Sequence, residues 1–217
     1  MNWRNLFSDV KNIFKRLDRI ALLNTIKAKA KNQGNGFIYL NRNTSLQLAP
    51  AAVLLIENQA YFYFNEYWHQ PDPFPGMLGV HTGGVMQVTG NFTIYSGARL
   101  VVNENARLVL GSGYINHGLN LNCFKSIEIG RDVAISENVT IRDSDNHGMK
   151  AAGYKGTLPI KIGDHVWIGM NVTILKGVTI GDGAIIAAGA VVNKNIPARC
   201  LAAGVPARVL KENVEWH

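Results

Sequence analysis

The chain has 217 residues, 47% of them hydrophobic and 17% charged, with a formal net charge of +7. This length suits one sizeable core and is too short for two ordinary domains. No apolar run is long enough to span a membrane, and the charged N-terminal segment lacks the apolar centre of a signal peptide. The two cysteines, Cys123 and Cys200, stand far apart without metal-binding neighbours, so we predict reduced thiols and a cytoplasmic protein.

The positive charge is concentrated at the N-terminus. Residues 1–31 contain eight lysines and arginines against two aspartates, a balance of +6. Apolar residues recur at three- and four-residue spacing over residues 3–21, so we predict a basic amphipathic helix in the N-terminal unit, residues 1–31. Such a helix either packs on its own protein or lies on an anionic membrane, here the inner face. Because no stacking aromatics accompany the charge, a nucleic-acid partner is not expected.

A turn-rich break at residues 32–36 separates this helix from β-branched and aromatic runs, which predict strands at 37–40, 53–56 and 61–64. From Ile162 onward the sequence divides into hexads, namely IGDHVW, IGMNVT, ILKGVT, IGDGAI, IAAGAV and VNKNIP. Every first and fifth position is aliphatic. Neither an α-helix nor a simple alternating strand keeps two aliphatic columns in register every six residues. The period predicts an all-β coil with three flat sides, one hexad per side, whose stacked turns share one core. We assign this domain to residues 37–206 and a tail to residues 207–217.

The repeat is broken once in its regular half. Ile129, Ile135 and Ile141 lead hexads, but the step from Ile141 to Ile162 is 21 residues, which six does not divide. One loop must therefore be extruded between them, and we place it at residues 143–158. Looser hexads precede this region, with a small offset between successive sets.

The motifs INHGLNLNCFKSIEIG and IRDSDNHG, the six hexads and the final AAGVPARVLK resemble the hexapeptide-repeat acyltransferases, which include galactoside, maltose, xenobiotic and serine O-acetyltransferases. The resemblance covers residues 108–211 closely. The first half is similar, more weakly, to sugar acetyltransferases of surface-polysaccharide synthesis. The resemblance implies a left-handed parallel β-helix and a homotrimer with active sites between subunits. It also implies acetyl-CoA as the acyl donor, a sugar hydroxyl as the acceptor and no metal.

By this resemblance, His147 matches the catalytic base. A sugar hydroxyl attacks a thioester poorly unless its proton is removed, and a neutral imidazole suits that task near neutral pH. Asp143 or Asp145 could orient the ring, as carboxylates do in catalytic triads, although a backbone carbonyl could do the same. The backbone N–H of Met170 matches the family's donor to the oxyanion.

Acetyl-CoA is expected in the outer groove between coils. The resemblance assigns the donor to Ala188, Asn193, Lys194, Arg208 and Lys211. A small residue such as Ala188 lets the pantetheine arm approach the backbone, and the three cations can neutralise CoA phosphates. The other interpretation of the cations is an ordinary solvated surface.

The acceptor is expected at Asn116, which matches a family position that contacts the sugar. Two other functions remain open. One is N-acetyl transfer to an amino sugar. The other is a zinc β-helix like the γ-type carbonic anhydrases, raised by His81, His117 and His147, although the spacing of zinc ligands in that family is missing.

Overall fold

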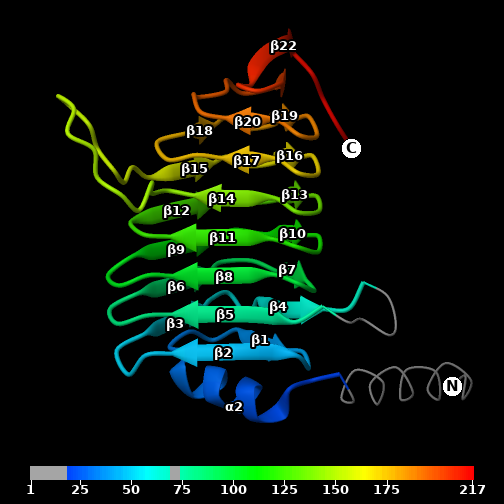
Figure 1. Cartoon of the computed structure of the whole chain (residues 1–217). Helices are drawn as coiled ribbons and strands as arrows, with labels where there is room; N and C mark the ends of the chain where they lie inside the picture. Colours follow the sequence, from blue (N-terminus) through cyan, green and yellow to red (C-terminus); the bar gives the residue numbers. More distant parts are fainter. Residues whose placement is uncertain (1–18, 69–73) are drawn as a thin grey trace, which may run out of the picture.

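The chain forms a tapering stack of triangular coils with a helix at its base (Figure 1). The structure is a computed structural model that describes residues 19–68 and 74–217. Three sheets make the sides of the stack, and the chain passes from the first to the second to the third sheet in every coil. Within the described residues, every pair of strands is parallel except the last, β21 with β22.

The first sheet has nine strands, in the order β1 (Phe37–Leu40), β4 (Tyr61–Glu66), β7 (Phe92–Tyr95), β10 (Gly113–Ile115), β13 (Val133–Ile135), β16 (Trp167–Ile168), β19 (Ile185–Ile186), β21 (Cys200–Ala203) and β22 (Arg208–Glu212). The second has seven, β2 (Thr44–Leu48), β5 (Gly76–Val80), β8 (Arg99–Val102), β11 (Asn120–Cys123), β14 (Thr140–Arg142), β17 (Thr173–Ile174) and β20 (Val191–Val192). The third has six, β3 (Val53–Ile56), β6 (Val85–Val88), β9 (Arg107–Leu110), β12 (Ser126–Ile129), β15 (Ile160–Ile162) and β18 (Thr179–Ile180).

The coil is left-handed. In Figure 1 the strands of the second sheet lie in front and run leftward while the chain climbs from its base to its top. Crossovers between parallel strands are right-handed in nearly all other folds. The left-handed parallel β-helix implied by the family resemblance is therefore confirmed.

The hexads form the upper coils as predicted. Ile168 pairs with Ile186 and Ile174 pairs with Val192, so each coil takes 18 residues, or three hexads. All six first-position residues are at most 1% exposed. Corners turn at the fourth position, where Asn171 has a φ of 58°. The glycine at the second position lets coils stack closely, because a Cβ on Gly169 would lie 2.7 Å from the backbone nitrogen of Ala188.

The lower coils are wider and less regular. Phe37 pairs with Tyr61, 24 residues later, and the broad interior is filled by buried aromatic rings such as Phe62 and Phe64. Strand β12 sends two side chains inward, Ile127 and Ile129, both buried. This longer side explains the offset between the successive sets of hexads.

The base of the stack is covered by helix α2 (Leu22–Lys31). Its buried face is small, because Thr25 and Ala28 pack on the first coil and the Thr25 hydroxyl accepts the N–H of Leu40 at 3.1 Å. Of the helix expected over residues 3–21, residues 1–18 lie outside the described part. Residues 19–21 correct that expectation, because they are not helical and Ile20 forms a β-bridge with Asn41 instead. No helix among the described residues is long and apolar enough to cross a bilayer.

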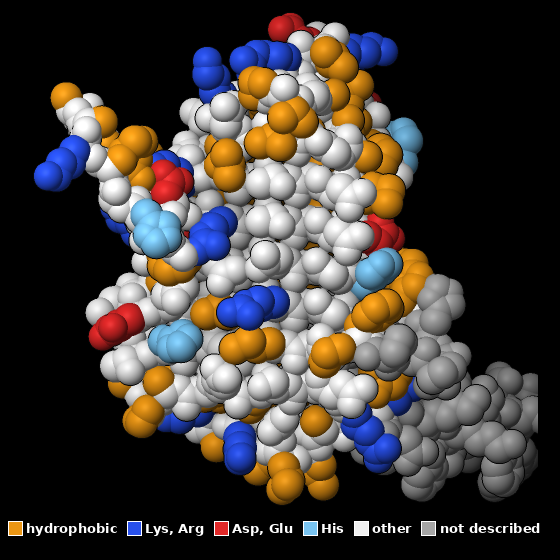
Figure 2. Space-filling model, viewed as in Figure 1, with side chains coloured by type: hydrophobic (Ala, Val, Ile, Leu, Met, Phe, Trp, Pro, Cys, Tyr) orange, Lys and Arg blue, Asp and Glu red, His pale blue; other side chains and the backbone are white. Residues whose placement is uncertain are grey.

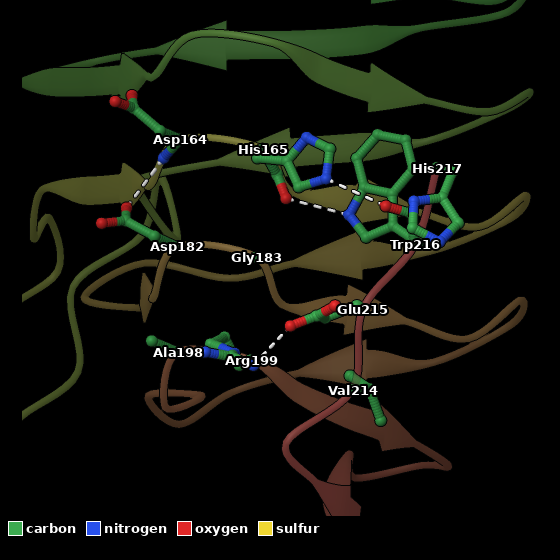
Figure 3. Close-up of a pocket in the computed structure, with 10 residues that line it drawn as sticks. All are labelled: Asp164, His165, Asp182, Gly183, Ala198, Arg199, Val214, Glu215, Trp216 and His217. Carbon is green, nitrogen blue, oxygen red and sulfur yellow. Dashed lines mark hydrogen bonds and ion pairs between the residues drawn. The ribbon is translucent and has the colours of Figure 1, made fainter.

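The predicted C-terminal tail is largely structured, which corrects its assignment as a separate tail. Residues 208–212 form β22, which pairs with β21 as the last strand of the first sheet. The segment after β22 then runs back along the corner between the third and first sheets (Figures 1 and 3). There Arg199 forms an ion pair with Glu215 at 2.6 Å.

The end of this segment is held by His165, a corner residue (Figure 3). The Trp216 indole stacks on its imidazole at 4.2 Å between ring centroids and donates to its carbonyl at 2.9 Å. The two ring nitrogens of His165 lie 2.6 Å from an Asp132 carboxylate oxygen and 3.1 Å from the Trp216 carbonyl oxygen. The hydrogen bond to Asp132 raises the pKa of His165, since only the charged ring donates to both acceptors. His165 therefore fastens the C-terminal segment.

Candidate functional site

A long loop leaves the stack at the corner between the second and third sheets. It connects β14 to β15 and covers residues 143–159, close to the predicted range. Its base is an antiparallel ribbon, with a β-bridge between Ser144 and Thr157, and its outer part stands away from the body (Figures 1 and 2). His147 lies near the start of this loop and is exposed. Among the described residues, no group is hydrogen-bonded to its ring, while its carbonyl oxygen accepts the Tyr154 hydroxyl at 2.9 Å.

Asp143 does not orient His147, and this corrects one sequence prediction. Its buried carboxylate accepts three backbone N–H groups, from Phe124 at 2.7 Å, Lys125 at 2.8 Å and Ser126 at 2.9 Å. Both carboxylate oxygens therefore accept hydrogen bonds from the corner of the coil below. They satisfy N–H groups for which this turn has no backbone acceptor. Asp143 stabilises the root of the loop.

Burial of Cys123 under the same corner raises the pKa of its thiol to about 12, with the nearby Asp143 charge adding to the shift. Cys123 therefore stays protonated and is not a nucleophile. Cys200 is likewise buried and free.

Asp145 contacts two side chains and not the His147 ring. The Lys176 ammonium donates to its carboxylate, and so does the Tyr154 hydroxyl at 2.7 Å. The hydrogen bond from Lys176 lowers the pKa of Asp145 most, and the hydrogen bond from Tyr154 lowers it further. Its connection to His147 runs through Tyr154, which also bonds the His147 carbonyl. Sequence reasoning missed Lys176 and Tyr154, because neither belongs to a motif that carries chemistry.

A second group of predicted residues gathers at another corner, between the first and second sheets. Asn116 follows β10, Met170 follows β16 and Ala188 follows β19. Strand pairing places these corners in one column, since Ile115, Ile135, Ile168 and Ile186 are successive partners. In Figure 1 this column lies at the right of the stack and the extruded loop at the left. A single chain therefore does not bring His147 to Met170.

The N–H of Met170 takes no part in the ladder of backbone hydrogen bonds among the described residues. Its neighbours are bonded, Gly169 N–H to the Ile186 carbonyl and Asn171 N–H to the Glu137 carbonyl. Within the described part of the chain, no acceptor is recorded for the Met170 N–H, nor for that of Ala188 one coil above. The corner thus offers backbone donors to a bound group.

Asn116 is half-buried in the same column. Its amide nitrogen donates to the Glu137 carboxylate at 3.0 Å. Its side-chain oxygen is buried and, among the described residues, has no hydrogen-bond partner. A buried amide oxygen without a donor is costly, so this atom is suited to accept a hydroxyl from an adjacent ligand.

The remaining predicted donor residues lie near the top of the stack. Asn193 and Lys194 follow β20, at the same corner as the loop, and Arg208 and Lys211 lie on β22. All four side chains are exposed. They therefore flank the upper coils on more than one side and converge on no single pocket of one chain.

Histidines that suggested zinc are divided between corners. His81 and His147 lie between the second and third sheets, and His117 lies between the first and second, where its ring stacks on Phe74. Within residues 19–68 and 74–217, no three His, Cys, Asp or Glu side chains gather in a way that could hold a metal ion.

The chain is similar to known proteins that contain hexapeptide repeats. Residues 159–194 match the family model described as bacterial transferase hexapeptide (six repeats). The chain is 36% identical over 134 residues to the polysialic acid O-acetyltransferase of Escherichia coli O1:K1 / APEC, which covers 60% of this chain and 42% of that protein. It is 31% identical over 147 residues to the putative lipopolysaccharide biosynthesis O-acetyl transferase WbbJ of Escherichia coli K12, covering 61% of this chain and 74% of the relative.

Among solved structures, the polysialic-acid-specific acetyltransferase NeuO superimposes with a TM-score of 0.61 over 87% of this chain and 89% of that one, at 22% identity, a likeness of fold. The chain belongs to the hexapeptide-repeat acetyltransferases. It spans less than half the length of the polysialic acid enzyme that it matches.

Proposed function

We propose that this protein transfers an acetyl group from acetyl-CoA to a hydroxyl group of a sugar, in the cytoplasm and in the synthesis of a surface polysaccharide. The observation that carries the proposal is the extruded loop with His147 on a hexapeptide-repeat β-helix, in a chain of this family. The relatives act, by their names, on polysialic acid and in lipopolysaccharide biosynthesis.

In the proposed reaction, the imidazole of His147 takes the proton of the sugar hydroxyl as its oxygen attacks the thioester carbonyl carbon. The tetrahedral intermediate carries an oxyanion, which accepts the free N–H of Met170. Collapse breaks the carbon–sulfur bond, and the departing thiolate takes the proton back from the imidazolium. The products are the O-acetyl sugar and free CoA.

The proposed enzyme is a homotrimer, because one chain keeps the base and the oxyanion donor at different corners. A cyclic arrangement of three copies can set the loop of one copy against the Met170 corner of the next. Asn116 and Ala188 lie in that corner column, so acceptor and donor would meet there as well.

The direct test is a screen of nucleotide sugars and surface glycans with acetyl-CoA, measured as release of the free thiol. Release with a sugar whose only reactive groups are hydroxyls supports O-acetyl transfer. Thiol release restricted to amino sugars would indicate N-acetyl transfer instead of O-acetyl transfer. No thiol release with any acceptor would contradict the proposal.

We expect Lys194 and Arg208 to bind the phosphates of CoA. Replacing either by alanine should raise the KM for acetyl-CoA more than it lowers kcat, because the phosphates are distant from the reacting carbon and their binding is largely the same in ground and transition states. Steady-state kinetics with acetyl-CoA as the varied substrate measure this. Lys161→Ala, on the outer face of β15, is the matched control. Unchanged donor kinetics in both variants would move the donor to another surface.

We also propose that the base of the stack contacts an anionic membrane. Helix α2 leaves Leu22, Leu23 and Ile26 exposed by 66%, 75% and 54%, beside Lys27. Figure 2 shows apolar and basic side chains together at this end. An apolar face rimmed by lysines is typical of a segment that lies in the headgroup region of anionic lipid.

Binding at the base should appear in sedimentation with vesicles that contain anionic lipid at low salt. Leu23→Asp should reduce the bound fraction several-fold, since it puts a negative charge in the apolar face. Leu210→Asp, an exposed leucine at the opposite end, should bind as the unaltered protein does. If the unaltered protein fails to sediment with anionic vesicles, or binds neutral ones equally well, the electrostatic membrane contact is excluded.

A further inference from the structure

The extruded loop is tied to the β-helix by Lys176, a residue to which the sequence analysis gave no role. Lys176 lies at the third position of the hexad ILKGVT, one coil above the root of the loop. Its ammonium donates to the Asp145 carboxylate on the outgoing limb of the loop. The same nitrogen donates to the Lys155 carbonyl at 2.8 Å and lies 4.3 Å from the centre of the Tyr154 ring, both on the returning limb. One side chain thus joins both limbs to the rigid stack.

The network continues to His147 itself. The Tyr154 hydroxyl lies 2.7 Å from the Asp145 carboxylate and 2.9 Å from the His147 carbonyl oxygen, so Lys176 and His147 are separated by only two side chains. The Lys176 side chain is 18% exposed, and its hydrogen bond to Asp145 raises its pKa while lowering that of Asp145. Both groups therefore stay charged across the neutral range.

We propose that Lys176 is a positioning residue, which sets where the loop holds His147 and thereby the rate of transfer. This inference rests on the proposed function. Ion pairs near a surface contribute little to overall stability, so we do not expect folding to depend on this network. Its consequence is geometric. The loop projects from the body and must present His147 to another subunit, and a displacement of roughly 1 Å at a reacting group can cost about a hundredfold in rate.

The decisive variant is Lys176→Met, which keeps most of the apolar side chain and removes the ammonium group. We expect kcat to fall by about 10- to 100-fold with little change in the KM for acetyl-CoA. A fall in kcat without a rise in KM separates this role from phosphate binding. Lys194 occupies the equivalent place in the next coil, and loss of a phosphate contact would raise the KM for acetyl-CoA instead. Tyr154→Phe should lower kcat less, and adding it to Lys176→Met should lower kcat by less than the product of the two single effects. Lys161→Met is the control of equal charge change and should keep wild-type kcat.

A readout without activity is hydrogen exchange of the loop amides in the full protein. Residues 146–156 should exchange faster in Lys176→Met than in the wild type, while amides of the neighbouring coils keep their rates. Wild-type kcat in Lys176→Met, or loop exchange equal to that of the wild type, would overturn the inference. If the wild type itself transfers no acetyl group, the proposed function fails, and the exchange experiment still decides whether Lys176 fixes the loop.

Discussion

Replacing His147 by alanine should lower acetyl transfer by about 10²–10⁴-fold, the usual contribution of a positioned general base. Folding and CoA affinity should be retained, because the side chain is exposed and its ring has no hydrogen-bond partner among the described residues. Rates at saturating acetyl-CoA, measured in the wild type and in His147→Ala, test this.

His165→Ala is the control for this experiment, because His165 holds the C-terminal segment at a different corner. Its transfer rate should change far less than that of His147→Ala. If His147→Ala keeps near-normal transfer while His117→Ala abolishes it, the base has been assigned to the wrong histidine.

Mixing two inactive variants tests whether the site is shared between subunits. His147→Ala and Asn116→Ala would each damage every site of a uniform trimer. In randomly mixed trimers, roughly a quarter of the interfaces join an intact His147 from one copy to an intact Asn116 from the next, and activity should recover to that extent. Recovery is impossible if each chain forms its own complete site, so the absence of recovery in verified mixed trimers would contradict the shared site.

Replacing Ile180 by aspartate should lower the free energy of unfolding by more than about 4 kcal/mol, among the largest effects of a single substitution. Ile180 is fully buried and stacks between Ile162 and Ile196 in the shared core. An aspartate there would carry an unpaired charge into an apolar interior, where no described side chain could neutralise it. Chemical denaturation at fixed protein concentration measures the change.

Thr179→Asp is the matched control, one residue away on the same strand. Thr179 faces outward, is exposed and lies beside Lys161 of the adjoining strand. The same new charge should therefore alter the free energy of unfolding by no more than about 0.5 kcal/mol. A similar loss of unfolding free energy in Ile180→Asp and Thr179→Asp would mean that these neighbouring residues do not face the core and the solvent in turn.

Much of the fold was determined by the sequence alone. A six-residue period needs only local information, since each hexad repeats the same strand and the same corner, and stacking of like on like then follows. The prediction failed where the period is absent. Strand β2 went unnoticed because the lower coils vary in length, and Thr25 and Ala28 of α2 face the core while its leucines face outward.

The site was determined only in part. Spacing revealed the loop with His147, because an interrupted period must place extra residues outside the coil. The partners of each side chain depended on which corners the coils bring together. Asp143 and Asp145 are two residues apart, yet the first turns inward to three backbone N–H groups and the second meets Lys176, 31 positions later in the chain. Such contacts depend on which coils stack on one another, and the local sequence does not encode this. Only the tertiary structure therefore showed that Asp143 stabilises the root of the loop while Asp145 belongs to the network around His147.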